Sequence, residues 1–224
     1  DFKNYKAEYL LHCVVLYAGR PGQETQRRML SDALTSQVSN DKRSAAVRAF
    51  LVRELRLIGD DGAVNALGAL LTNEALCDDA AAALLSIGSG AAPQFRAALP
   101  KAQGRCRLVV IQSLGVMRDT PSAAAMEKAL QDGDRDIRLA AVWGLARMGA
   151  SGSVPALLKA ADVEPVYERT KATQACLLMA ETLAAAGNRT DAARIYIHLR
   201  DTRTDPKEQY LRDLAAKALA GLGG

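Results

Sequence analysis

The chain has 224 residues, of which 49% are hydrophobic and 4% aromatic, with 29 Lys and Arg against 25 Asp and Glu. No run of about 18 apolar residues lacks a charge, so we expect no membrane span. A net charge of +4 is too small to indicate a nucleic-acid partner by itself. The chain begins at Asp1, and we expect either a processed protein or part of a larger chain.

The first predicted elements are two helices. Apolar residues recur at helical spacing over residues 5–17 and 24–38. Arg20-Pro21-Gly22 separates the two segments, as expected of a turn. We interpret residues 1–40 as a divergent first repeat or an N-terminal cap.

A recurring helix end then organises the rest of the chain. Six helices are predicted to end with a Leu placed four residues before a stop, and successive stops lie 29, 30, 31, 38 and 36 residues apart. A period of about 20–50 residues is typical of repeat proteins. The Leu–stop pairs are Leu55–Gly59, Leu84–Gly88, Leu114–Arg118, Leu145–Gly149, Leu183–Gly187 and Leu219–Gly223.

Each of these helices carries the same apolar face, because positions 12, 8, 7 and 4 residues before the stop are apolar in all six. A shorter apolar segment precedes most of them: 63–71, 91–99, 123–130, 154–161 and 192–199. Every unit is therefore a helix, a turn and a helix. We predict an all-α fold, a right-handed α-α superhelix (solenoid) of about six helical hairpin repeats.

A family resemblance lies in residues 134–145, which read Asp-Arg-Asp-Ile-Arg-Leu-Ala-Ala-Val-Trp-Gly-Leu. An acidic turn, an apolar–Arg pair, small residues and a final Leu make this run similar to the second helix of a HEAT repeat. The short bacterial HEAT repeats of the phycobilisome-lyase type look most similar. The resemblance implies one HEAT-like domain over 1–224, regular over 41–162. Residues 187–201 instead resemble a tetratricopeptide helix, which implies longer hairpins over 163–224.

An arginine recurs eleven residues before four of the stops: Arg48, Arg107, Arg138 and Arg212. The HEAT resemblance implies that such an arginine pairs with a carboxylate in a neighbouring turn and fixes the stacking of repeats. The candidate partners are Asp134 and Asp136 for Arg138, and Asp205 and Glu208 for Arg212. Alternatively, the four arginines contact phosphates or an acidic peptide along a concave wall.

Catalytic, metal and cofactor motifs are not found in the sequence. His12 and His198 lie far apart, and the four cysteines (Cys13, Cys77, Cys106 and Cys176) are scattered singly, which does not fit zinc spacings. The cysteines are expected to be buried thiols, with a Cys77–Cys106 disulfide as the alternative. Arginines also cluster near both ends, and we interpret those clusters, which include Arg203, as solvated faces.

The resemblance implies a non-enzymatic protein–protein interaction scaffold that binds a protein or peptide partner on its concave face. The chain would act as a monomer or as part of a larger chain, with no cofactor. One alternative is a nucleic-acid-binding protein resembling the HEAT-like alkylpurine DNA glycosylases, although a single Trp leaves their aromatic cradle missing. Another is a chromophore-lyase-type subunit, for which the sequence supplies no chemistry.

Overall fold

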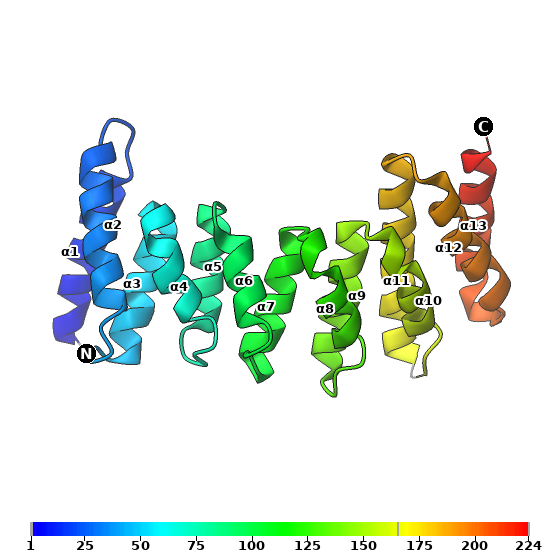
Figure 1. The fold of residues 1–224 in the computed structure, drawn as a ribbon, viewed down its shortest axis with the longest axis horizontal. Coiled ribbons are helices and arrows are strands. Elements are labelled where there is room, and N and C mark those ends of the chain that lie inside the picture. Colours follow the sequence, from blue (N-terminus) through cyan, green and yellow to red (C-terminus); the bar gives the residue numbers. More distant parts are fainter. Residues whose placement is uncertain (1, 165, 224) are drawn as a thin grey trace. The chain divides into compact units, whose positions relative to one another are not determined.

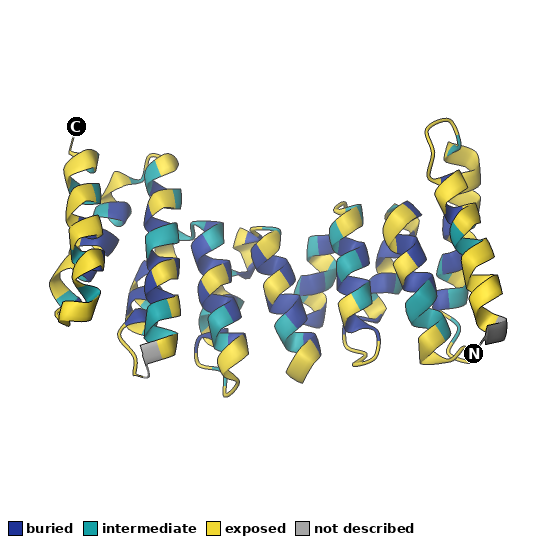
Figure 2. Ribbon diagram, turned by 180° about the vertical axis from the view of Figure 1, so that it is seen from behind, coloured by how far each residue is buried: buried dark blue, intermediate teal, exposed yellow. Residues whose placement is uncertain are grey.

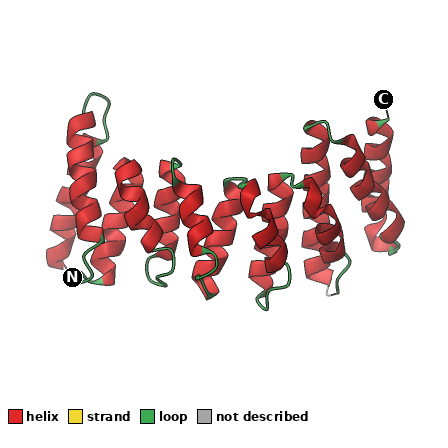
Figure 3. Cartoon of the chain, in the orientation of Figure 1, coloured by secondary structure: helices red, strands yellow, loops and turns green. Residues whose placement is uncertain are grey.

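The regular elements are all helices in the residues that the computed structural model describes, 2–164 and 166–223 (Figure 3). Single 3-10 turns precede four of the α-helices: η1 (Asp61–Ala63), η2 (Thr120–Ser122), η3 (Ser151–Ser153) and η4 (Pro206–Glu208). Within these residues, none of the helices has the length and apolar character needed to cross a membrane.

The chain forms two compact units, residues 1–113 and 114–224. In the first unit, the odd-numbered helices lie side by side in one layer and the even-numbered helices cover them in a second layer (Figure 1). Its helices are α1 (Phe2–Ala18), α2 (Glu24–Val38), α3 (Ala45–Ile58), α4 (Val64–Ala69), α5 (Cys77–Ile87), α6 (Ala91–Ala98) and most of α7 (Gly104–Val116).

The second unit repeats this arrangement. The long helix α11 packs against α9, while α8 packs on α9 and α10 packs on α11. The last hairpin pairs α12 with α13, and α12 also contacts α10 and α11. After the end of α7, its helices are α8 (Ala123–Ala129), α9 (Arg135–Met148), α10 (Val154–Ala161), α11 (Val166–Ala185), α12 (Arg189–Thr202) and α13 (Gln209–Leu222).

The recurring Leu anchors the odd-numbered helices in the core. Five of the six are at most 3% exposed (Leu55, Leu84, Leu114, Leu145 and Leu183), whereas Leu219 in the last helix is half-buried. The predicted helical register is therefore correct from α3 to α11. The all-α fold and the solenoid class are confirmed, while a single domain over 1–224 stays a prediction.

Most of the predicted stops close their helix in the left-handed conformation. The φ angle is positive at Gly88, Arg118, Gly149 and Gly187. A residue other than glycine is strained at positive φ, so Arg118, with φ 52°, is the strained residue among these stops. Gly59 differs, with φ −56°, although its N–H still donates to the Leu55 carbonyl.

Candidate functional site

Three of the four recurring arginines close the turn that precedes their own helix. Each donates to a backbone carbonyl at or just after the end of the previous helix, where helical partners run out. The donor–acceptor pairs are Arg48 Nε with Val38 (2.8 Å), Arg107 Nη1 with Leu99 (3.2 Å) and Arg138 Nη1 with Asp132 (2.8 Å). Arg212 contacts Gln209 on its own helix instead.

The carboxylate that pairs with Arg138 is Glu168 on α11, and not Asp134 or Asp136. Arg138 forms a two-pronged contact, with Nη2 at 2.7 Å and Nε at 3.0 Å from the Glu168 oxygens. Asp134 instead accepts the Asp136 N–H and caps α9, because first-turn N–H groups have no helical acceptor. Asp136 lies 3.6 Å from Arg135.

The two carboxylates expected to pair with Arg212, Asp205 and Glu208, also bind other groups. Asp205 accepts the Lys207 N–H at 2.8 Å, which caps the turn η4. Glu208 pairs with Arg169 of α11, with Nη2 at 2.9 Å from Oε2. A binding role for the four recurring arginines stays a prediction.

In each unit a ladder of ion pairs, which was not anticipated from the sequence, joins an odd-numbered helix to the next one or to the turn that leads into it. Each pair spans about one repeat along the chain, which is the signal that could have identified it. In the first unit the pairs are Arg53–Asp79 (3.1 Å) and Arg105–Asp78 (2.6 Å). In the second they are Arg138–Glu168 (2.7 Å), between α9 and α11, and Arg169–Glu208 (2.9 Å), between α11 and the turn η4 just before α13. The hydrogen bond from Arg138 lowers the pKa of Glu168 below its ordinary value.

Arg203 was expected on a solvated face, and this was wrong: its side chain is fully buried. Nη2 donates to the Ala161 carbonyl at 2.8 Å and Nη1 to the Asp162 carboxylate at 3.0 Å. The signal was its register, since Ile195 and Leu199 lie on the buried side of α12 and Arg203, the residue after the end of α12, continues their four-residue spacing. Burial would raise the pKa of Asp162, but hydrogen bonds from Arg203 and His198 outweigh it and lower that pKa.

The four thiols are free, so the alternative Cys77–Cys106 disulfide is not formed. Cys77, Cys106 and Cys176 are buried, as expected, but Cys13 is exposed on α1. Burial raises the pKa of Cys77 and of Cys176 to about 12, so neither is a thiolate at neutral pH. Among the described residues, no group of three or more His, Cys, Asp and Glu side chains is arranged to hold a metal ion.

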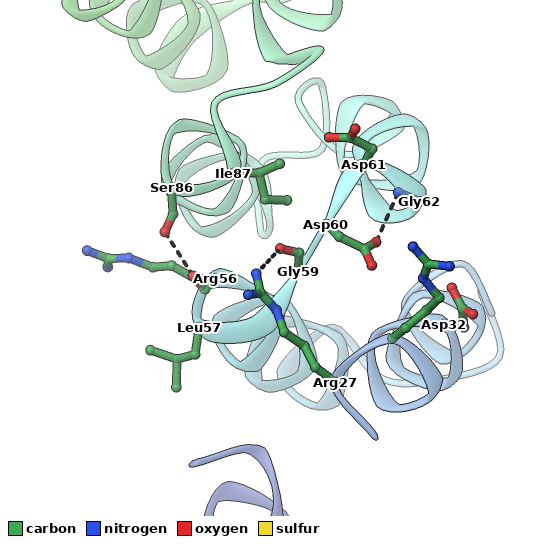
Figure 4. A pocket seen from close by; sticks show the side chains of 11 residues that line it. Arg27, Asp32, Arg56, Leu57, Gly59, Asp60, Asp61, Gly62, Ser86 and Ile87 are labelled. Carbon is green, nitrogen blue, oxygen red and sulfur yellow. Dashed lines mark hydrogen bonds between the residues drawn. The ribbon is translucent and has the colours of Figure 1, made fainter. Parts of the chain in front are cut away.

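A cavity of about 600 Å³ lies where α2, the end of α3 and α5 meet (Figure 4). Arg27 lies on one side and donates to the carbonyls of Ile58 (2.9 Å), the last residue of α3, and of Gly59 (3.2 Å), the residue after it. Asp60 accepts the Gly62 N–H on the opposite side. Arginines and aspartates share this lining, so it offers no excess of one charge for an ionic ligand.

Exposed apolar side chains concentrate on the odd-numbered helices. Of the fifteen large apolar side chains that are exposed in the described residues, twelve lie on odd-numbered helices, two on even-numbered helices and one in a loop. Figure 2 shows the exposed positions of these helices, with α1 mostly exposed along its length. In the first unit, three of these side chains (Tyr5, Tyr9 and Leu57) line an open cavity of about 500 Å³ between α1 and α3.

In the second unit, exposed aromatic rings on α9 and α11 are covered by cations. The Arg147 guanidinium lies 4.7 Å from the centre of the Trp143 ring. Tyr167, 54% exposed, has Arg135 at 5.4 Å and Lys171 at 5.8 Å from its ring centre. Trp143 also packs across to α7, where its ring approaches Gly115.

Known proteins that are similar to this chain include one protein family and several designed or engineered structures. Residues 92–177 match the family described as HEAT repeats, whereas no curated protein matches the chain. Similar solved structures include an engineered protein (18% identity, TM-score 0.46, covering 95% of this chain and 96% of that one). They also include a designed armadillo repeat protein in complex with the peptide (KR)4 (18% identity, TM-score 0.48, covering 93% and 99%). The family match supports a HEAT-like repeat protein, and the phycobilisome-lyase and tetratricopeptide resemblances stay predictions.

Proposed function

We propose that the chain is a non-enzymatic scaffold that binds a partner protein on its odd-numbered helices. The observation that carries this proposal is the uneven distribution of exposed apolar side chains, twelve of fifteen on that set of helices. Within each unit, exposed apolar side chains gathered on one layer of helices are typical of an interaction site. HEAT-type and armadillo-type repeat folds are generally non-catalytic, which supports the same conclusion.

The kinds of side chain agree with protein recognition. Tyr, Trp and Arg are the residues most enriched where binding energy concentrates in protein interfaces. Tyr5 and Tyr9 on α1, Tyr167 on α11 and Tyr210 on α13 are each more than half exposed. A tyrosine offers a large apolar ring together with a hydroxyl group, and it loses little conformational freedom on binding because its side chain has only two rotatable angles.

The test is affinity capture from a lysate of the source organism with two matched double variants. Tyr9→Ser/Tyr167→Ser removes one exposed aromatic from an odd-numbered helix of each unit, whereas Met29→Ser/Ile197→Ser removes exposed apolar groups from even-numbered helices. We expect one discrete protein to be captured by the wild type and by the Met29→Ser/Ile197→Ser control. Its recovery by Tyr9→Ser/Tyr167→Ser should fall about tenfold.

Equal recovery by both double variants would contradict the proposal. A second arm repeats the capture with nuclease and at two salt concentrations. Recovery that depends on nucleic acid and falls steeply with salt would instead favour the nucleic-acid-binding alternative.

A further inference from the structure

We infer that the groove between α1 and α3 binds an amphipathic helix of a partner, apolar along its centre and acidic along one edge. This inference rests on the proposed function, since it names the contact within the odd-numbered helices and the chemistry of what docks there. The α1–α3 groove is defined by Tyr5, Tyr9, His12, Phe50 and Leu57, together with the charged residues Glu8, Arg53, Glu54 and Arg56.

The first argument is the spacing of side chains on α1. Tyr5, Tyr9, His12 and Leu16 are four, three and four residues apart, which is the stripe by which one helix packs on another. Tyr5 is 64% exposed, Tyr9 58% and Leu16 52%. A different face of α1 packs within the unit, because Val15 and Ala18 are buried against α2 and α3. α1 therefore carries a second helix-packing stripe, in which His12 contacts Glu54 of α3 while the side chains of Tyr5, Tyr9 and Leu16 are exposed.

The second argument is the shape of the α1–α3 groove. The two helices run alongside each other, since His12 bonds Glu54 at 3.0 Å and Gly19 approaches Ile58 farther along. Phe50 and Leu57 of α3 extend the apolar surface, and the Tyr5 and Tyr9 rings stack 6.5 Å apart. The stripe spans about 16 Å at 1.5 Å per residue, which is the length of about three turns of a docked helix.

The third argument is charge. Arg53 and Arg56 lie on the α3 side of the groove, and Arg53 also forms an ion pair with Asp79 of α5 at 3.1 Å. The exposed Arg56 guanidinium makes no hydrogen bond or ion pair within the described residues. Of the two carboxylates, Glu54 is 5% exposed and bonded to His12, so Glu8 is the one that faces solvent. The α3 edge is therefore cationic, and acidic side chains of the docked helix would lie along it.

The test uses synthetic helical peptides as probes and fluorescence anisotropy as the readout. The acidic probe carries leucines spaced by four, three and four residues with glutamates beside them; a second probe has lysine in place of every glutamate, and a third has the acidic composition scrambled. We expect the full chain to bind the acidic probe with a Kd of tens of micromolar, about tenfold more tightly than either other probe. Equal binding of the acidic and scrambled probes would overturn the inference.

Variants locate the binding. Tyr9→Ser should weaken binding of the acidic probe about tenfold. Arg56→Glu should weaken it about fivefold and strengthen binding of the lysine probe, because the charge of the edge is reversed. Arg56 is exposed, so neither outcome depends on a folding defect. The control Met29→Ser, on an even-numbered helix, should bind as the wild type does; unchanged probe preference in Arg56→Glu would contradict the inference.

The same variants separate this inference from the proposed function. If the captured partner is lost from Arg56→Glu and Tyr9→Ser, the α1–α3 groove is its binding site. If the partner is retained by both but lost from Tyr9→Ser/Tyr167→Ser, the scaffold function stands and the groove inference fails. Capture that none of these variants affects would contradict both.

Discussion

At the scale of single residues, Arg138 closes its own turn and also pairs with the next odd-numbered helix. Replacing it by Gln should lower the free energy of unfolding by about 1–3 kcal/mol, because a charge-assisted contact between α9 and α11 is lost. Arg135→Gln is the matched control, three residues earlier and exposed, and should cost only about 0.5 kcal/mol, because it loses an exposed contact with the Tyr167 ring and no ion pair to α11. Urea unfolding of the two variants measures the difference, and similar losses would contradict the assignment.

The Arg138–Glu168 contribution should also depend on pH. The hydrogen bond from Arg138 lowers the pKa of Glu168 in the folded protein below its ordinary value of 4.5. The stabilisation is therefore complete above about pH 4.5 and is lost as the pH falls through the folded pKa. The gap between wild type and Arg138→Gln should be largest near pH 7 and shrink in acid. A gap that is constant down to pH 3 would show that Glu168 is not involved.

Arg203 is the residue whose burial was not anticipated. Arg203→Met should destabilise the protein by about 2–3 kcal/mol, because the Ala161 carbonyl and the Asp162 carboxylate lose a charged donor. Arg200→Met, three residues earlier on α12 and paired with its neighbour Asp201 at the surface, should change stability by less than about 0.5 kcal/mol. Thermal unfolding of both variants tests this, and a silent Arg203→Met would mean that burial of the guanidinium contributes nothing.

At the scale of elements, the approach of α7 to α9 depends on glycine. A Cβ added at Gly115 would lie 2.8 Å from the Gly144 Cα and 3.1 Å from the Trp143 ring. Gly115→Ala should therefore cost about 1–3 kcal/mol by overpacking, although alanine favours helix. Gly221→Ala in α13 meets nothing within 4 Å and should be neutral or stabilising by up to about 1 kcal/mol. Urea unfolding measures the stability of the two variants. A stabilised Gly115→Ala would mean that α7 and α9 can move apart at this contact without loss of stability.

The elements themselves were predictable from sequence, but most contacts between them were not. The Leu–stop pattern located α3, α5, α7, α9 and α11, because local spacing fixes which face is buried. The partner of Arg138 lies 30 residues away, and Asp134 was the nearer carboxylate in sequence. Asp134 caps its helix instead, so a local backbone requirement determined its role. Such competition between local and distant partners cannot be read from spacing alone.

The candidate site was harder still to anticipate. Tyr5, Tyr9 and Leu16 have ordinary core spacing, and a helix with this pattern is normally buried on that side. Only the arrangement of neighbouring helices shows that the stripe is exposed beside α3. Sequence therefore located the residues of the groove on a helix, and the packing of α1 was needed to recognise them as a surface.

At the scale of the whole molecule, each repeat packs mainly on its neighbours, so damage should stay local. Leu145→Ala removes a fully buried side chain from α9 and should cost about 2–5 kcal/mol in urea unfolding. In hydrogen exchange, protection should fall in α8–α11 while α2–α5 of the first unit exchange as in the wild type. Leu84→Ala in α5 is the reciprocal control, with the loss confined to the first unit. If either variant lowers protection equally in all helices, the chain unfolds in a single cooperative event, and the stability of the protein is not a sum over neighbouring repeats.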